Sequence, residues 1–286
     1  MKLVTFYGKN KLKVGALKGN DIVDLTRSGI AKTMMDLIAG GTDILKEVRT
    51  AIKNPKSPRV ALNGARLAPP IPRPGKVLCS GINYKGHADE NPNAKMPTEP
   101  FFFAKMPSVV IGHDDVIPFP KQTQQLDYEV EFTAVIGSPL SNATEKDVMA
   151  ALFGYTLLND VSARDVQFKD NQITLGKNFN GFCPMGPCVV TADDMTAPEN
   201  TKLQTRLNGV TLQNGTTADW LFSLPRLISF LSQTMALEPG DCVSTGTPAG
   251  IGLFRAPPIF MKPGDVVEIE AAGIGVLRNS IGKIMA

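Results

Sequence analysis

The sequence predicts an α+β protein in which strands dominate, with a small N-terminal α/β module ahead of a larger β-rich domain. Three observations support this fold class. Short apolar runs are separated by many of the 26 glycines and 22 prolines, helical spacing is confined to a few segments, and no regular series of alternating strands and helices appears. The 286 residues, of which 43% are hydrophobic, suffice for one large domain or for a large and a small one.

The N-terminal part begins with three short predicted strands, KLVTFYG, LKVGALKG and DIVDL, which glycines and charges interrupt. Residues 31–53 then show apolar positions at helical spacing and predict a helix. The stretch ARLAPPIPRPGK, residues 65–76, contains four prolines and predicts an extended linker. We therefore expect a small module over residues 1–70 and a catalytic domain over residues 71–286.

The larger part is rich in strands and turns. Asn208-Gly209 lies between two apolar runs and predicts a tight hairpin turn. Residues 226–236 predict a helix. The C-terminal stretch PGDVVEIEAAGIGVLRNSI predicts two strands around a glycine turn.

Composition excludes several classes of function. The net charge of +3 is too small to indicate a nucleic acid or an anionic membrane as partner. No apolar run approaches the roughly 18 residues of a membrane helix. The N-terminus lacks the apolar stretch of a secretory signal, so we expect a cytoplasmic protein and leave import into an organelle open. The four scattered cysteines predict buried free thiols.

Several motifs of nucleotide-binding and hydrolytic enzymes are incomplete here. Gly176-Lys177 matches the Gly-Lys pair of a P-loop. However, Asn178 stands where the motif needs Ser or Thr, and Asn171 stands where it needs its first Gly. GTPAGIG carries Arg255 where a dinucleotide-binding loop needs Gly or Ala, and no GxSxG elbow is present. The chain has two histidines, His87 and His113, which argues against a zinc site and favours oxygen ligands for any metal.

The stretch DYEVEF, residues 127–132, carries three carboxylates. In a single strand, Asp127, Glu129 and Glu131 would share one face, opposite an apolar face. A half-exposed edge strand is one interpretation. A metal site is the other, because like charges at alternate positions repel one another unless a cation lies between them.

Asp160 follows the apolar run YTLL, and His87 and Glu90 lie three residues apart in SGINYKGHADE. The aspartate is either a metal ligand or the cap of a turn or helix. Together with the acids of DYEVEF and with water, it would complete an octahedral oxygen site suited to Mg²⁺ or Mn²⁺. The histidine and the glutamate would meet on one helical turn, either as a catalytic pair or as a satisfied surface turn. His113 is interpreted as a loop residue without a role.

Five further donors occur in apolar or glycine-rich surroundings. Each alone has a structural explanation, but together they would bind a substrate carboxylate and an enolate. They are Lys105, Arg164, Gln167, Lys177 and Thr247.

Seven blocks in this order resemble the fumarylacetoacetate hydrolase family, from about residue 74 to the C-terminus. They are KVLCSGINYKGHADE, FFFAKMPS, DYEVEFTAVIG, GYTLLNDVSARDVQ, LGKNFNGFCPMGP, STGTPAGIG and PPIFMKPGDVVEIE. The resemblance is greatest to the small subgroup that includes acylpyruvases, oxaloacetate decarboxylases or tautomerases, and sugar-acid hydrolases. It implies a mixed β-roll catalytic domain, usually in a homodimer, with one Mg²⁺ or Mn²⁺.

The resemblance also implies roles for individual residues. It places the metal on Glu129, Glu131 and Asp160, with Asp127 beside the site. It makes His87 and Glu90 the pair that activates water, and it places Lys105, Arg164, Gln167, Lys177 and Thr247 around the substrate. Ser80 stands where fumarylacetoacetate hydrolases proper carry a fourth acidic ligand, which argues against fumarylacetoacetate as the substrate.

The resemblance leaves three reactions of a small 2-oxo acid open, since all pass through a metal-stabilised enolate. We expect hydrolysis of a C–C bond in an acylpyruvate-like 2,4-dioxo acid, with His87, Glu90 and Lys177 as the catalytic residues. Decarboxylation or keto–enol tautomerisation of oxaloacetate is the alternative, beside a related sugar-acid hydrolase. A catalytically silent, metal-stabilised binding module is the alternative from another class, and the retained His87 and Glu90 argue against it.

Overall fold

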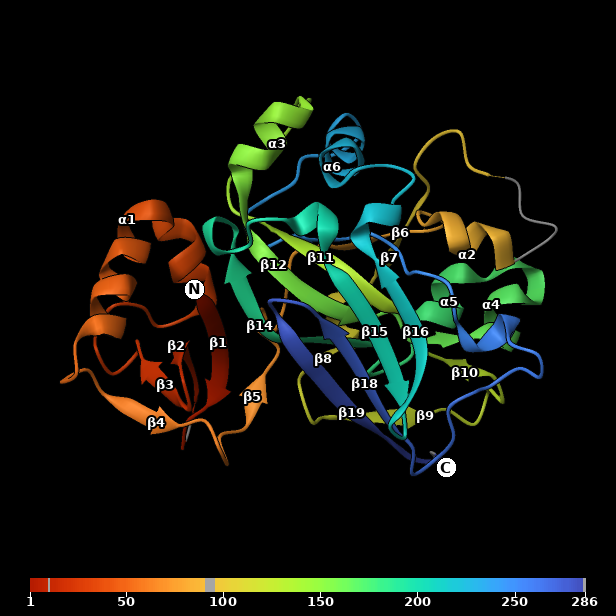
Figure 1. The fold of residues 1–286 in the computed structure, drawn as a ribbon, viewed down its shortest axis with the longest axis horizontal. Helices are drawn as coiled ribbons and strands as arrows, with labels where there is room; N and C mark the ends of the chain where they lie inside the picture. The colour runs from red at the N-terminus through yellow and green to blue at the C-terminus, as the bar shows by residue number, and fades with distance from the viewer. Residues whose placement is uncertain (10, 91–95, 285–286) are drawn as a thin grey trace.

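The computed structural model describes residues 1–9, 11–90 and 96–284 (Figure 1). A small N-terminal part lies at one end of the molecule, and a larger strand-rich part carries the remaining elements. The α-helices in the described residues are α1 (Met34–Lys53), α2 (Lys85–Glu90), α3 (Glu145–Ala151), α4 (Arg164–Phe168), α5 (Ile173–Lys177) and α6 (Leu224–Ser232). None of them is long and apolar enough to cross a membrane.

The N-terminal part packs one helix on a small antiparallel meander. Helix α1 begins after Thr33, whose hydroxyl accepts a hydrogen bond from the Asp36 amide, while the Asp36 carboxylate accepts one from the Thr33 amide. The backbone of Gly41 leaves the helical region, with φ 54°, so α1 is kinked there. The buried side of α1 belongs to the same apolar core as residues of the first two strands.

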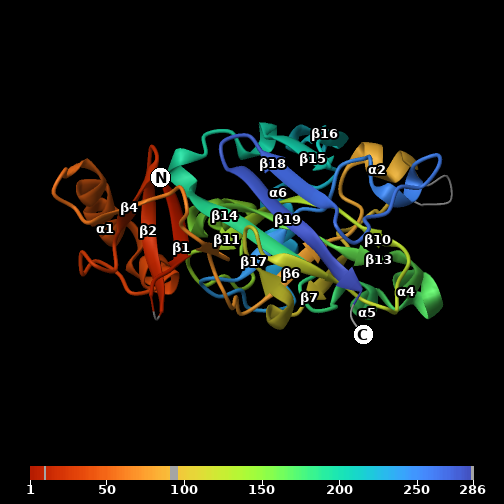
Figure 2. The same cartoon turned by 90° about the horizontal axis from the view of Figure 1, so that it is seen from below.

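The principal sheet runs through both parts of the molecule. Among the described residues its order is β4-β3-β2-β1-β14-β12-β11-β17-β6-β7, with β5 beside β1 and β8 beside β14. Its strands are β1 (Lys2–Tyr7), β2 (Leu12–Lys18), β3 (Asp21–Asp24), β4 (Arg59–Ala61), β5 (Leu67–Ala68), β6 (Val77–Ser80), β7 (Phe102–Lys105), β8 (Val110–Ile111), β11 (Val130–Ile136), β12 (Leu152–Asn159), β14 (Cys183–Thr191) and β17 (Cys242–Ser244). Figure 2 shows β1 and β14 side by side, and Leu3 pairs with Val189 at this junction.

A second sheet packs against strands β11, β12 and β14 of the first. Its order is β16-β15-β18-β19-β9, and β10 (Leu126–Asp127) forms a separate two-stranded ladder with β13 (Ser162–Ala163). Phe132 of β11, Leu203 of β15 and Ile269 of β18 lie in one buried core between the two sheets. The strands of the second sheet are β9 (Val116–Phe119), β15 (Lys202–Leu207), β16 (Val210–Thr216), β18 (Val266–Ala271) and β19 (Gly275–Ile284).

Most elements expected from the sequence are present. The strand-dominated α+β class is confirmed. The Asn208-Gly209 turn joins β15 to β16, and the last two strands are β18 and β19. The helices expected over 31–53 and 226–236 begin at Met34 and Leu224, after the capping residues Thr33 and Ser223, and the second ends at Ser232. All four cysteines are free and buried, as expected.

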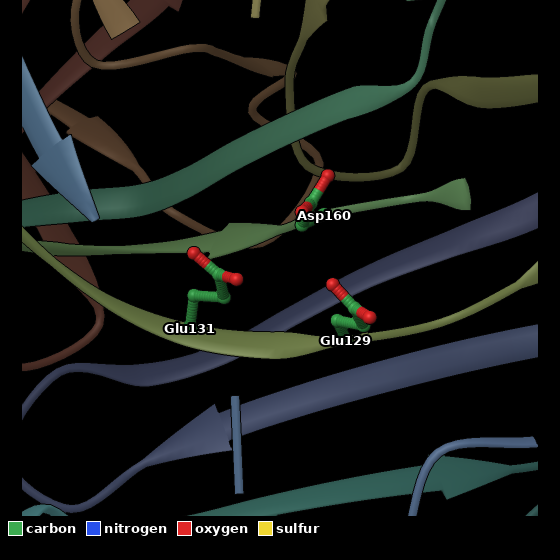
Figure 3. A group of neighbouring side chains, drawn as sticks. All are labelled: Glu129, Glu131 and Asp160. Carbon is green, nitrogen blue, oxygen red and sulfur yellow. The ribbon is translucent and has the colours of Figure 1, made fainter. Parts of the chain in front are cut away.

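The expectation of one unbroken strand over DYEVEF is wrong. Asp127 ends β10 and pairs with Ser162 of β13, whereas β11 begins at Val130 and pairs with Asn159 of β12. The chain therefore changes partner strand between Asp127 and Val130. Consequently the three acids do not share one face of one strand. Glu129 and Glu131 lie near Asp160 (Figure 3), whereas the Asp127 carboxylate accepts hydrogen bonds from Arg164 and from the amides of Gly252 and Leu253.

Candidate metal centre and active site

The ends of β11 and β12 bring three carboxylates together. Glu129 precedes β11, Glu131 is its second residue, and Asp160 follows β12. The Asp160 amide donates to the Glu129 carbonyl at 2.9 Å, and the Glu129 amide donates to Asn159 Oδ1 at 3.0 Å, so the two backbones are joined at this point. One oxygen from each of the three carboxylates lies within 4.8 Å of the others (Figure 3). We call these three acids the carboxylate floor.

Buried cations bind two members of the carboxylate floor. Lys177 Nζ donates to Glu129 Oε2 at 2.8 Å and to Asp160 Oδ2 at 2.6 Å. Arg164 Nη2 donates to the other oxygen of Glu129 at 2.5 Å. Burial alone would raise the pKa of Glu129, but Arg164 and Lys177 outweigh it and hold this pKa well below its usual range. Burial raises the pKa of Asp160, which the positive charges of Lys105 and Lys177 only partly offset.

Glu131 has a different environment from Glu129. Its side-chain oxygen Oε2 is buried and has no hydrogen-bond partner among the described residues. Burial, followed by repulsion from Asp160 and Glu129, raises the pKa of Glu131 well above its usual value. A buried carboxylate with an oxygen that has no partner, beside two other carboxylates, is costly unless a cation joins them.

The donor set fits one divalent cation. Three carboxylates converge, and Glu131 Oε2 is buried without a partner among the described residues. A hard cation that prefers oxygen ligands would bind this oxygen and would offset the repulsion between the carboxylates. Glu129, Glu131 and Asp160 would hold it, and such an ion supplies Lewis-acid polarisation of a ligand carbonyl.

His87 and Glu90 form the expected pair on α2. His87 Nδ1 lies 2.9 Å from Glu90 Oε2. This contact assigns the ring proton to Nδ1 and leaves the Nε2 lone pair available as a base. The other oxygen of Glu90 accepts a hydrogen bond from the Gly250 amide at 2.7 Å, which ties α2 to the loop after β17.

A cavity of about 230 Å³ joins the pair to the carboxylate floor. It is lined by seven of the residues expected at the site, namely His87, Glu129, Glu131, Arg164, Gln167, Lys177 and Thr247. Gln167 accepts from Arg164 Nη1 at 3.1 Å, and the Thr247 hydroxyl accepts from Gln213 Nε2 at 2.8 Å. Glu90 and Asp160 do not line the cavity themselves. Glu90 contacts the lining residue His87, and Asp160 contacts the lining residue Lys177.

Lys105 and His113 lie elsewhere. The ammonium of Lys105 is buried outside the cavity lining, donates to the carbonyls of Val161, Lys177 and Phe182 at 2.7–3.1 Å, and lies 2.7 Å from Asp160 Oδ1. This position suits the support of Asp160 better than contact with a substrate. His113 lies in a turn, where its Nδ1 accepts from the Arg278 amide at 3.2 Å, and it does not line the cavity.

The structure shows the contacts of Asp127, which the resemblance placed beside the site without a role, and of Gln213, which sequence reasoning did not assign. Asp127 accepts hydrogen bonds from Arg164 Nε at 2.9 Å and from the amides of Gly252 and Leu253 at 2.8 and 3.1 Å. It thereby connects the arginine that holds Glu129 to the short 3₁₀ turn η6 (Gly252–Phe254), which lines the cavity. The only sequence feature that pointed to Asp127 was its place two residues before Glu129. No sequence feature pointed to Gln213, because its contacts come from residues distant in the chain.

Apart from Ser80 and Gly81, the rest of the cavity lining consists of apolar side chains, which sequence reasoning missed as well. Six of them, which we call the apolar wall, are Ile82, Phe101, Phe103, Ile173, Leu253 and Phe254. They come from four separate segments, so no local pattern in the sequence groups them. Phe103 lies beneath Lys177, with the ring centroid 4.9 Å from Nζ, and Phe254 lies 6.2 Å from the His87 ring.

Comparison with known proteins places the chain in a family. Residues 76–282 match the family model described as fumarylacetoacetate (FAA) hydrolase C-terminal. The chain belongs to the fumarylacetoacetate hydrolase family, as its motifs suggested.

Relatives and solved structures cover almost the whole chain. A mitochondrial oxaloacetate tautomerase of Bos taurus is 38% identical over 98% of this chain and 91% of its own. The oxaloacetate tautomerase YisK of Bacillus subtilis is 36% identical over 99% of this chain and 100% of its own. A fumarylacetoacetate hydrolase structure from psychrophilic Exiguobacterium antarcticum has a TM-score of 0.86 at 33% identity, covering 99% of both chains. A maleylpyruvate hydrolase from Sphingobium sp. SYK-6, solved with manganese(II) and pyruvate, has a TM-score of 0.84 at 26% identity, covering 100% of both chains.

Proposed function

We propose that this protein is a metal-dependent keto–enol tautomerase of 2-oxo acids, with oxaloacetate as a substrate. The observation that carries the proposal is that one cavity holds both the carboxylate floor and a histidine oriented by a glutamate. Relatives of nearly full length are oxaloacetate tautomerases, which favours this reaction over the hydrolysis expected from the sequence. Mg²⁺ or Mn²⁺ is the proposed ion, because all three candidate ligands are carboxylates.

Tautomerisation requires that one proton moves between C3 and the oxygen on C2. His87 Nε2 takes the proton from C3, and the electron pair of the broken C–H bond forms the C2–C3 double bond. The carbonyl π pair moves onto the oxygen, and His87 Nε2 delivers the proton taken from C3 to this oxygen, so the base is restored and atoms and charges balance. Glu90 holds the imidazole in the tautomer that leaves Nε2 as the base. Gln167 and the Thr247 hydroxyl, which line the same cavity, orient the acid.

Hydrolysis of an acylpyruvate-like 2,4-dioxo acid is the second candidate. It is favoured by the similarity to the maleylpyruvate hydrolase and by the same histidine–glutamate pair, which could deprotonate water instead of C3.

Three substrates tested in parallel distinguish the reactions. Enol-oxaloacetate should lose its ultraviolet absorbance faster with the Mg²⁺-loaded protein than with the chelator-treated protein, without release of pyruvate. Pyruvate release from oxaloacetate, coupled to lactate dehydrogenase, would indicate decarboxylation instead. Loss of acetylpyruvate absorbance with release of acetate would favour the hydrolase. A protein that accelerates none of the three reactions with Mg²⁺ or Mn²⁺ would contradict the proposed function and favour a silent binding module.

A further inference from the structure

The structure assigns a second substrate class to this cavity: we propose that the protein tautomerises 2-oxo acids with an aromatic substituent on C3, such as phenylpyruvate. This inference rests on the proposed tautomerase function and concerns the part of the substrate that the carboxylate floor does not bind. The support for this inference is that the apolar wall lies beside His87, in the same cavity.

The cations of the cavity are already engaged. Arg164 donates to Asp127, Glu129 and Gln167, and Lys177 donates to Glu129 and Asp160. Among the described lining residues, these two are the only lysine or arginine side chains. His87 is the remaining basic group, and its partner Glu90 offsets any positive charge that it gains. The lysine and arginine side chains of the described lining thus already have carboxylate partners, so they do not restrict the C3 substituent to a charged group.

The substituent on C3 must lie near the apolar wall. C3 has to approach His87 Nε2 for proton transfer, and the ring of Phe254 lies 6.2 Å from the imidazole. Phe103 covers Lys177 at the edge of the floor, with 4.9 Å between the ring centroid and Nζ. The Phe101 ring packs so closely on Gly81 that a Cβ there would come within 2.3 Å of it. These surroundings suit a ring, which gains free energy from burial and aromatic contact.

The size of the cavity is sufficient for such a ligand. An apolar cavity of about 150 Å³ accommodates a benzene ring. The cavity here measures about 230 Å³, which leaves room for a pyruvate head group on the carboxylate floor. The phenyl ring also acidifies the C3 proton, because the carbanion is conjugated with it, so the same proton transfer becomes easier.

The first experiment compares the decay of two enols. The Mg²⁺-loaded protein should accelerate ketonisation of enol-phenylpyruvate with a kcat/KM at least equal to that for enol-oxaloacetate. Acceleration of oxaloacetate alone would overturn this inference and leave the proposed function intact. Acceleration of neither enol would overturn both.

A pair of variants on α5 tests whether the apolar wall selects the substrate. Ile173 lines the cavity, whereas Leu175, two residues later, is 57% exposed and does not. Ile173→Lys should lower the ratio of kcat/KM for phenylpyruvate to that for oxaloacetate by at least about tenfold. Leu175→Lys should change this ratio by less than about twofold. Equal losses on both substrates in Ile173→Lys would contradict selection by the wall.

A binding measurement covers the case in which Ile173→Lys does not fold or loses activity for another reason. Leu253→Lys changes the wall from a different segment. Benzoylformate, an aromatic 2-oxo acid with no C3 hydrogen to lose, serves as the calorimetric probe on Mg²⁺-loaded protein. It should bind at least about tenfold more tightly than pyruvate to the parent. The tighter binding of benzoylformate should disappear in whichever of Ile173→Lys and Leu253→Lys is folded. Equal affinity of the parent for the two acids would overturn the inference.

Discussion

The carboxylate floor and the His87–Glu90 pair face one cavity but are held in different ways. The three floor acids lie at the ends of β11 and β12, in the middle of the principal sheet, and Lys105, Arg164 and Lys177 surround them. The pair lies on the six-residue helix α2, and Glu90 joins it to the Gly250 loop through a single hydrogen bond. In the proposed mechanism, the sheet thus fixes where the metal and the ligand bind, whereas the orientation of the His87 base depends on Glu90. Changes in the floor should abolish binding and turnover together, and changes in the pair should affect turnover alone.

The largest effect is expected from Glu131→Ala. This removes the carboxylate with an unpaired buried oxygen, so Mg²⁺ affinity should fall by more than about 100-fold, and metal-dependent activity should be lost. Calorimetry with Mg²⁺ measures the first effect and the enol assay measures the second. The matched control is Glu238→Ala, which alters a side chain that is 70% exposed and does not line the cavity. Parent-like Mg²⁺ affinity in Glu131→Ala would remove this residue from the metal centre.

His87→Ala should separate catalysis from binding. Loss of a general base typically lowers the rate by about 10²- to 10⁴-fold, and kcat should fall by this amount while Mg²⁺ affinity stays at the parent value. The control is His113→Ala, which alters the other histidine of the chain, outside the cavity lining. If His87→Ala retained full activity, or weakened Mg²⁺ binding as strongly as Glu131→Ala does, the contrast between the two regions would fail.

A smaller effect should follow from Glu90→Gln. The amide oxygen of Gln can still accept the hydrogen bond from Gly250, but the negative charge that orients His87 is lost. We expect kcat to fall by about tenfold with little change in KM. Glu90→Ala, which also removes the connection to the loop, should lose more. A loss in Glu90→Gln as large as that in His87→Ala would instead make the carboxylate itself the base.

The smallest effect concerns the stability of the metal-free protein. The raised pKa of Glu131 means that the folded protein retains a proton that the unfolded chain releases near the ordinary pKa of 4.5. Stability should therefore decrease as pH rises from that value through the raised pKa of the folded state. Glu131→Gln removes this charge and should raise the Tm of metal-free protein at neutral pH, by about 2–4 °C for each kcal/mol gained. Calorimetric scans from pH 5 to pH 8 test this prediction. An unchanged Tm at every pH would show that the burial of this charge carries no cost.

The sequence predicted the floor better than the rest of the cavity, and the reason is physical. Glu129 and Glu131 belong to one short segment, and Asp160 ends an apolar strand, so local patterns indicate all three. The change of partner strand that moves Asp127 away depends on pairing with Ser162, which no local pattern shows. The roles of the site residues themselves stay predictions, as do the homodimer and the boundary near residue 70.

Lys105 illustrates the second limit. A lysine in an apolar run suggested a ligand for a substrate anion, but three backbone carbonyls from other parts of the chain accept its protons. The apolar wall is a third case, because its members come from separate segments and individually resemble ordinary core residues. Contacts between residues distant in the chain decide all of these features.

The pairing of β1 with β14 has a consequence for any attempt to isolate the catalytic region. The family match begins at residue 76, which invites a shortened version that starts near the expected boundary at residue 70. Without β1, the last part of β14, with Val189 and Val190, would become an open edge beside β12, while β8 would still pair with the first residues of β14. Long apolar edges recruit strands from other molecules. We therefore expect a version that starts near residue 70 to self-associate through this edge, and a replacement strand or charged substitutions along it to reduce that association.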